Sequence, residues 1–216
     1  MIELTNISKS YKTQSVLDKI SFFAKSNQFS SIMGMSGSGK TTLLRIIAGL
    51  IRPDEGQVKI DKIVVGSKNV YVEPYKRSLG YVFQEAALWP HMTVEKNISF
   101  GLANMNRKEI LNRTNLIMKH TNTLEYRHKY PSQISGGQAK RVALARALAP
   151  NPKYILLDEP LTNLDFKARI ELLDLLVSIK ENSDAGFVYV SHQKDEIDYL
   201  KGNLWILKSG KLVKDE

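Results

Sequence analysis

The sequence predicts an α/β protein built on a mixed sheet, with an antiparallel β part near the N-terminus and a helical subdomain inserted later. Three observations predict this class. Short apolar strands alternate with amphipathic helices, a glycine-rich turn joins an early strand to a helix, and the stretch from about Glu85 to Pro150 is mostly helical in pattern. We expect the 216 residues to form a single domain, residues 1–216, with about residues 85–150 as the inserted subdomain.

The first third of the chain reads as strands around one helix. The helix is indicated by Leu43, Leu44, Ile47 and Leu50, which recur at helical spacing. A turn rich in Pro, Asp and Gly follows at residues 52–56. The elements predicted here are strands at residues 2–7, 16–24, 28–33, 57–60 and 79–83, and a helix at residues 40–50.

The later elements have clear start and stop signals. Asn106 is a suitable N-cap for a helix that runs to about Lys119, and Pro150 ends a helix rich in Ala and Leu. Ser209-Gly210 suits the turn of a terminal hairpin. The elements predicted here are helices at residues 136–149 and 166–180, and strands at residues 154–157, 187–190, 204–207 and 211–213.

Composition excludes several classes of protein. The chain has no cysteine, which rules out disulfides, thiolate metal sites and thiol catalysis. No apolar run approaches the roughly 18 residues of a membrane span, and the first residues lack a secretory pattern. We therefore expect a cytoplasmic chain.

The net charge of +9 is concentrated in one segment. Residues 96–153 contain 11 basic residues and only two acidic ones, Glu109 and Glu125, so the rest of the chain is neutral overall. This pattern fits a solvated basic face, attraction to anionic headgroups or attraction to phosphates. Because the segment lacks the interleaved aromatic residues of a single-strand binding surface, we expect no nucleic-acid partner.

The strongest local motif is the segment Gly34–Thr41, which fits the pattern G-x-x-x-x-G-K-[ST] between a strand and a helix. Glycines let backbone N–H groups close around a β-phosphate, and the helix N-terminus adds a positive dipole. Lys40 is expected to reach the β- and γ-phosphates and the Thr41 hydroxyl to bind Mg²⁺. The motif predicts a nucleoside triphosphate site.

A second motif is the buried strand Tyr154–Leu157, which ends in Asp158 and Glu159. Ligand sites of open α/β sheets lie at the carboxyl ends of strands, so both carboxylates are expected beside the phosphate loop. Asp158 would hold Mg²⁺ through water, and Glu159 would polarise the attacking water as general base.

A second anion-binding helix start is predicted at Ser135-Gly136-Gly137-Gln138, with Ser135 as N-cap. Two interpretations stay open from the residues alone. The segment either caps its helix and does nothing more, or it meets the γ-phosphate of a nucleotide bound to another subunit.

Taken together, the motifs of this chain resemble those of the ATPase subunit of an ATP-binding-cassette (ABC) transporter. The residues that carry the resemblance, in order, are Gly34–Thr42, Gln84, Ile134–Gln138, Asp158–Pro160, Asp165 and His192. The resemblance covers nearly the whole chain and implies the P-loop NTPase fold of ABC ATPases. It also implies a head-to-tail dimer that holds two ATP molecules, each between one phosphate loop and the partner's Ser-Gly-Gly-Gln.

The resemblance assigns a role to each matching position. Tyr11 would stack on adenine beside Val16, Gln84 would touch Mg²⁺ or the attacking water, Asp165 would lie at the dimer seam, and His192 would contact the γ-phosphate. The catalytic set is then Lys40, Gln84, Glu159 and His192, and the metal set is Thr41, Gln84 and Asp158. The nucleotide set is Tyr11, Val16, Gly34, Ser36, Gly37, Ser38, Gly39, Lys40, Thr41, Thr42, Ser135, Gly136, Gly137, Gln138 and Asp165. The histidines left as surface residues are His91, His120 and His128.

The segments Val82–Val94 and Asn97–Leu102 are similar to those of bacterial importers of oxyanions, ferric iron, polyamines, sugars or thiamine. The implied activity is Mg²⁺-dependent ATP hydrolysis at the cytoplasmic face of the membrane. The implied partners are integral membrane permease subunits, a substrate-binding protein and a second cassette, identical or different. Leu88 and Trp89 are expected to be exposed and to contact the permease. Because the chain ends at Glu216, regulation through a C-terminal β-domain is not expected.

Three other functions remain as alternatives. An ABC exporter or mechanotransmission ATPase would share the chemistry and differ in its partner. A soluble ABC ATPase acting on ribosomes or DNA usually has two fused cassettes or long coiled coils, which this chain lacks. A small-molecule kinase would need a phosphoacceptor pocket and would leave the segment Ser135–Gln138 without a purpose.

Overall fold

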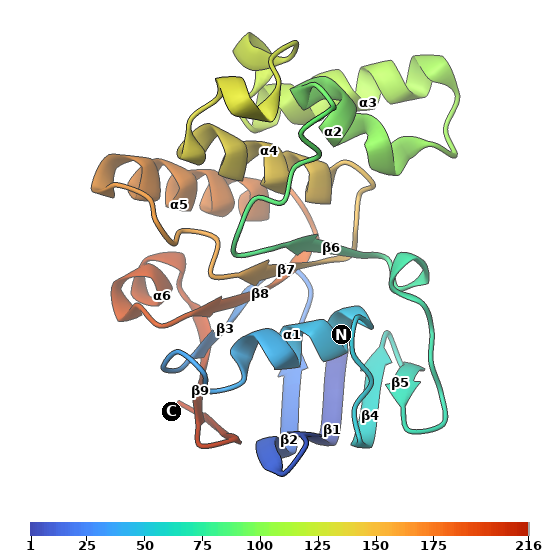
Figure 1. Ribbon diagram of the computed structural model, residues 1–216, viewed down its shortest axis with the longest axis vertical. Coiled ribbons are helices and arrows are strands. Elements are labelled where there is room, and N and C mark those ends of the chain that lie inside the picture. Colours follow the sequence, from blue (N-terminus) through green and yellow to red (C-terminus); the bar gives the residue numbers. More distant parts are fainter. Residues whose placement is uncertain (216) are drawn as a thin grey trace.

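An antiparallel sheet forms the lower part of the molecule in Figure 1. The computed structural model describes residues 1–215. The sheet has four strands in the order β2-β1-β4-β5. Its members are β1 (Ile2–Tyr11), β2 (Gln14–Ala24), β4 (Glu55–Ile60) and β5 (Ile63–Ser67).

A second sheet of six strands has the order β10-β9-β3-β8-β7-β6. It consists of β3 (Phe29–Met33), β6 (Leu79–Val82), β7 (Tyr154–Asp158), β8 (Gly186–Ser191), β9 (Gly202–Lys208) and β10 (Lys211–Lys214). Strands β9, β3, β8, β7 and β6 run parallel, whereas β10 returns antiparallel to β9 as the predicted hairpin. The carboxyl ends of β3, β7 and β8 therefore meet at one edge, where such sheets bind ligands.

Helices cover both faces of the second sheet. Helix α1 (Lys40–Ala48) lies between the two sheets and packs on Tyr154 and Leu156 of β7. The alternate residues Ile155 and Leu157 face the other way, towards the cluster that contains α4, α5 and α6. Those helices span Gly136–Leu148, Phe166–Glu181 and Lys194–Leu200. The alternation explains why β7 is apolar along its whole length.

The chain between β6 and β7 is helical. It contains α2 (Val94–Ser99), α3 (Arg107–His120) and α4, which lie above β6 in Figure 1. Asn106 caps α3 as expected, because its side chain accepts from the N–H of Glu109 while the Glu109 carboxylate accepts from the N–H of Asn106. Short 3₁₀ turns occur at Pro74–Lys76, Phe100–Leu102, Leu124–Tyr126 and Pro131–Gln133.

The structure confirms the predicted α/β class with its N-terminal antiparallel part, and it adds three short elements. Strand β5 and helices α2 and α6 were not predicted. Each has at most seven residues, so hydrophobic periodicity has too few turns or alternations to show it. Among the helices of residues 1–215, none is long and apolar enough to cross a membrane.

A buried arginine ties α1 to the neighbouring sheet. Arg77 is 3% exposed. Its guanidinium donates to the carbonyls of Ile46 and Ile47 at the end of α1 and to that of Val65 in β5. A cation at a helix C-terminus is favourable, and here it also satisfies carbonyls that the helix leaves free. This contact fixes the helix that begins at the phosphate loop.

Candidate nucleotide site

The glycine-rich loop runs from β3 into α1, with its backbone tied to the neighbouring strand. The N–H of Gly34 donates to the carbonyl of Ser191, at the end of β8, over 3.3 Å. Gly39 has φ of +105°, and a Cβ there would lie 2.9 Å from Leu17 and 3.1 Å from Val16. Only glycine fits this backbone, because both the angle and the space exclude a side chain.

Lys40 lies inside this loop. The side chain is 4% exposed, and Nζ donates to the carbonyls of Gly34 at 2.7 Å and Met35 at 3.1 Å. Nζ also lies 3.1 Å from Oε1 of Glu159. The loop thus wraps around an ammonium group that faces the carboxyl edge of the sheet.

Thr41 and Asp158 meet directly, as the two motifs predict. The Thr41 hydroxyl donates to Oδ1 of Asp158 at 2.9 Å, and the Tyr81 hydroxyl donates to Oδ2 at 2.9 Å. Burial raises the pKa of the Asp158 carboxyl, although these hydrogen bonds and Arg45 favour its charged form. Burial and the neighbouring Asp158 likewise raise the pKa of Tyr81. The role of Tyr81 was not predicted, although it stands three residues before Gln84.

Glu159 and His192 are also brought together. Nδ1 of His192 lies 3.1 Å from Oε2 of Glu159, and the Thr162 hydroxyl lies 3.5 Å from the same oxygen. Glu159 has φ of +44°, in the left-handed region that is unfavourable for a side chain with a Cβ. Strain of this kind is concentrated at functional sites.

A buried network supports the loop that carries His192. Glu196 is 3% exposed and accepts from the Tyr189 hydroxyl at 2.6 Å and the Ser191 hydroxyl at 2.7 Å. The Ser191 oxygen in turn accepts from the N–H of Gln193 at 3.0 Å. The residues on both sides of His192 are therefore fixed from within the core. Sequence reasoning did not identify this network, because its contacts join β8 to α6.

The predicted adenine contact lies on the β1–β2 hairpin. Tyr11 is 46% exposed, with Nζ of Lys9 5.7 Å from its ring centroid. Val16, on the returning strand, touches the phosphate loop at Gly39. The exposed Tyr11 ring is available to stack on a base.

The structure does not bring the Gln84 side chain to the metal pair. It is exposed and, within residues 1–215, makes no hydrogen bond to Thr41 or Asp158. Its segment is instead held from α4. Nζ of Lys140 donates to the carbonyl of Gln84, and Arg146 donates to the carbonyls of Ala86 at 3.0 Å and Ala87 at 2.7 Å. The contacts of these two basic side chains were not predicted.

The expectation that Leu88 and Trp89 are exposed was wrong. Both are half-buried. Leu88 packs on the helical core, and the Trp89 ring lies 4.2 Å from that of Phe100 with the Arg146 guanidinium 4.8 Å above it. The physical reason is that Phe100, just after α2, and Arg146 of α4 provide an apolar and a cationic partner for this segment. Trp89, Phe100 and Arg146 line a cavity of about 340 Å³.

The second glycine-rich helix start lies on the surface. Ser135 caps α4 through a reciprocal pair of hydrogen bonds with Gln138, and a Cβ on Gly136 would meet no atom within 4 Å. Asp165 caps α5 by accepting from the N–H of Ala168 at 2.9 Å. Among the hydrogen bonds of residues 1–215, none joins the segment Ser135–Gln138 to the phosphate loop.

The donor set at the phosphate loop fits a nucleotide with Mg²⁺. Within residues 1–215, Oγ of Ser38 is buried and has no hydrogen-bond partner. A phosphate oxygen of a bound nucleotide would accept a hydrogen bond from this hydroxyl. Thr41 and Asp158 offer a hydroxyl and a carboxylate, the oxygen ligands that Mg²⁺ prefers when phosphates complete its shell. Within residues 1–215, no group of three or more His, Asp or Glu side chains could hold a metal by itself.

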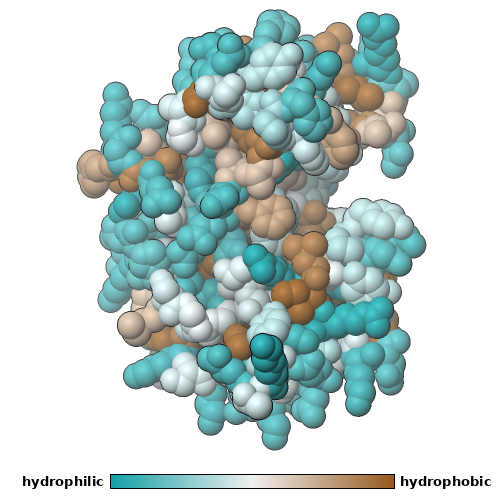
Figure 2. Space-filling view, viewed as in Figure 1, coloured by the Kyte–Doolittle hydropathy of each residue, from teal (hydrophilic) through white to brown (hydrophobic). Residues whose placement is uncertain are grey.

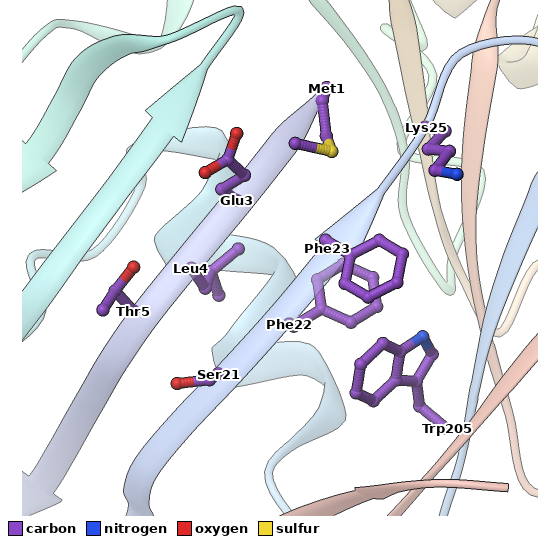
Figure 3. Close-up of a pocket in the computed structure, with 9 residues that line it drawn as sticks. All are labelled: Met1, Glu3, Leu4, Thr5, Ser21, Phe22, Phe23, Lys25 and Trp205. Atoms are coloured by element: carbon purple, nitrogen blue, oxygen red, sulfur yellow. The ribbon is translucent and has the colours of Figure 1, made fainter.

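A pocket lined by residues of β1, β2 and β9 is separate from this site. Figure 3 shows the rings of Phe22, Phe23 and Trp205 gathered at one end of it, and none of the predicted site residues lines it. Phe22 and Phe23 each meet Trp205 edge to face with centroids 5.3 Å apart. These contacts join β2 to β9 and explain the pocket as part of the packing between the two sheets.

Comparisons with known proteins agree with this geometry. The family model described as ABC transporter matches residues 17–162. The chain is 39% identical over 97% of its length to the spermidine/putrescine import ATP-binding protein PotA of Bacillus cereus, and 38% identical over 99% to the Fe(3+) ions import ATP-binding protein FbpC 2 of Haemophilus influenzae. It spans 64% and 60%, respectively, of the length of these relatives.

A solved structure is similar along the whole chain. The dimeric post-hydrolysis state of the ATP-binding cassette MJ0796, bound to ADP and Pi, matches with a TM-score of 0.88 and 33% identity, covering 100% of this chain and 98% of that one. This similarity confirms the predicted fold, and the matched family confirms the resemblance seen in the motifs. The chain belongs to the ABC transporter family and has the fold of its ATP-binding cassettes.

Proposed function

We propose that this chain is the ATP-binding and ATP-hydrolysing subunit of an ABC importer. The observation that carries the proposal is the convergence of three features at the carboxyl edge of one sheet. Lys40 lies in the phosphate loop, Thr41 is bonded to Asp158, and Glu159 is beside His192. A phosphate binder, a metal pair and a base with its orienting partner are the parts that phosphoryl transfer to water needs.

Each part has a distinct role in the proposed reaction. Lys40 and the loop N–H groups bind the β- and γ-phosphates, and Ser38 supplies a further hydroxyl. Thr41 and Asp158 would hold Mg²⁺, which neutralises charge on the phosphate oxygens. Glu159 accepts the proton of the attacking water, and His192 keeps that carboxylate in place while it faces the γ-phosphate.

The second glycine-rich helix start gives a reason for a dimer. The segment Ser135–Gln138 lies on the surface, separate from the phosphate loop of its own chain. A helix start of this kind suits an anion such as a γ-phosphate. We assign it to a nucleotide on a second cassette, with Asp165 at the seam. The dimeric form of MJ0796 supports this arrangement.

The descriptions of the relatives support import as the direction of transport and membrane proteins as partners. PotA and FbpC 2 are described as import proteins for spermidine/putrescine and for Fe(3+) ions. Permease subunits are then partners at the cytoplasmic face of the membrane, and the cavity beside Trp89 and Phe100 suits a permease helix. Residues 85–150 would act as a helical subdomain that carries this contact.

The substitution Glu159→Gln tests the activity. It removes the base while keeping the volume of the side chain, so turnover should fall by roughly 10²–10⁴-fold with ATP affinity retained. The variant should also accumulate as an ATP-bound dimer. Glu125→Gln, at an exposed glutamate, is the matched control. Full turnover in Glu159→Gln would remove Glu159 from its role.

The assignment to a membrane transporter needs a separate measurement. Purification of the chain from detergent-solubilised native membranes should recover a multi-span permease with it. Recovery in the soluble fraction alone, together with ribosomes or nucleic acid, would contradict the membrane assignment and leave the ATPase proposal untouched.

A further inference from the structure

The excess positive charge lies in the helical part of the chain, outside the segment that forms the phosphate loop. Residues 96–153 carry 11 basic and two acidic residues. Of the two, Glu109 is occupied in the cap of α3, where its carboxylate accepts from the N–H of Asn106 at 3.0 Å. Little free negative charge is therefore left to balance the lysines and arginines of this part.

Helix α3 presents basic and apolar side chains together on its exposed side. Thr114, Ile117 and Met118 are buried against the core. The opposite side has Lys108 and Lys119 between Leu111 and Leu116, which are 51% and 44% exposed. We call the α3 surface the set Lys108, Leu111, Leu116 and Lys119.

The basic side chains of the α3 surface form no ion pair within the part of the chain that the structure describes. Within residues 1–215, no ion pair involves Arg107, Lys108 or Lys119, whereas the neighbouring Arg127 pairs with Glu95 at 3.5 Å. Figure 2 shows hydrophilic and hydrophobic residues interleaved at the upper right, where Figure 1 places the start of α3. Exposed leucines between unpaired lysines are typical of helices that lie on an anionic bilayer.

We propose that the α3 surface contacts the anionic headgroups of the membrane beside the permease. The orientation of the α3 surface towards the membrane rests on the proposed function. Phe100 and Gly101, which precede α3 in the chain, line the cavity assigned to a permease helix, so the start of α3 lies near that contact in the sequence. A nucleic acid fits less well, because the α3 surface has no aromatic ring on which a base could stack.

The test is co-flotation of the purified chain with vesicles, without permease. Binding is expected to vesicles of phosphatidylglycerol mixed with phosphatidylcholine, to weaken with added salt, and to be absent from pure phosphatidylcholine. Each lysine near such a surface contributes roughly five-fold, so Lys108→Gln/Lys119→Gln should weaken binding about 25-fold. Leu111→Ser/Leu116→Ser should weaken binding several-fold and leave its dependence on salt concentration unchanged.

A matched control separates this surface from general basicity. Lys25→Gln/Lys68→Gln removes two exposed lysines from the part of the chain without net charge, and should leave vesicle binding unchanged. Equal loss in both double variants, or no binding by the unaltered chain, would overturn the proposal. Tighter binding of the α3 surface to duplex DNA or RNA than to vesicles would also overturn it. ATP hydrolysis by the same samples reports separately on the proposed function.

Discussion

Two glycine-rich helix starts in this chain look alike in sequence and differ in their surroundings. The first, before α1, surrounds a buried Lys40 and is joined through Thr41 to Asp158. The second, before α4, is exposed, and Gly136 has open space around its Cα. Both present free backbone N–H groups and a positive helix end.

The difference shows that a helix start becomes a complete site only through its neighbours. The first start obtains its neighbouring groups from the carboxyl ends of β7 and β8 of its own chain. These groups are Asp158, Glu159 and His192. The second start has only its own cap, Ser135 with Gln138. It therefore needs groups from elsewhere, which is why we assign it to a second cassette.

Gly136→Arg should have the largest effect, and it tests directly whether the second helix start takes part in turnover. The new side chain fits the separate chain, so the free energy of unfolding should change by less than about 0.5 kcal/mol. It would obstruct the assembled site, so turnover should fall by roughly 10²–10³-fold while the affinity of the separate chain for ATP stays the same. Steady-state ATPase assays and nucleotide titration measure the two quantities.

The control for this variant is Ser132→Arg, which adds the same charge at a nearby exposed position. It should hydrolyse ATP at the normal rate. A Gly136→Arg chain with normal turnover would show that the second helix start is only a cap.

Lys40→Ala should act on the first helix start alone. It removes an ammonium that makes charged hydrogen bonds, so ATP affinity should drop by roughly 10–100-fold in the separate chain. Nucleotide titration measures this, with Lys68→Ala as a control at an exposed lysine. Unchanged affinity would count against the assignment of the phosphate loop.

Asp158→Asn should abolish Mg²⁺-dependent turnover, because it removes a proposed metal ligand. Its effect on stability should be the smallest of the effects predicted here. Burial raises the pKa of Asp158 above 3.8, so the folded state binds its proton more tightly than the unfolded state does. The charged carboxylate therefore lowers stability, and this cost appears as the pH rises from the ordinary pKa through the raised one.

The asparagine variant lacks this cost. Without nucleotide, it should have a higher Tm than the unaltered chain at neutral pH, and the difference should disappear in acid. Thermal unfolding across a pH series measures this. A lower Tm at neutral pH would mean that the hydrogen bonds from Thr41 and Tyr81 outweigh the burial cost.

Local patterns were enough to predict much of the fold and the first helix start. The Gly34–Thr41 motif and the strand ending at Asp158 are short continuous segments, and parallel pairing brings their ends together. The contacts of Tyr81, Lys140 and Arg146 could not be predicted, because each depends on which faces of distant elements pack together. The half-buried state of Trp89 has the same origin.

A mixing experiment tests the central claim, that the second helix start completes a site on another chain. Two variants in the Glu159→Gln background, one also Lys40→Ala and the other also Gly136→Arg, should each stay monomeric with ATP. When the two variants are mixed, light scattering should detect a heterodimer with about one ATP per two chains. One composite site of the symmetric pair is then intact, since it combines the unaltered phosphate loop of one chain with the unaltered second helix start of the other. A mixture that stays monomeric, or a Gly136→Arg chain that dimerises alone with ATP, would contradict the account.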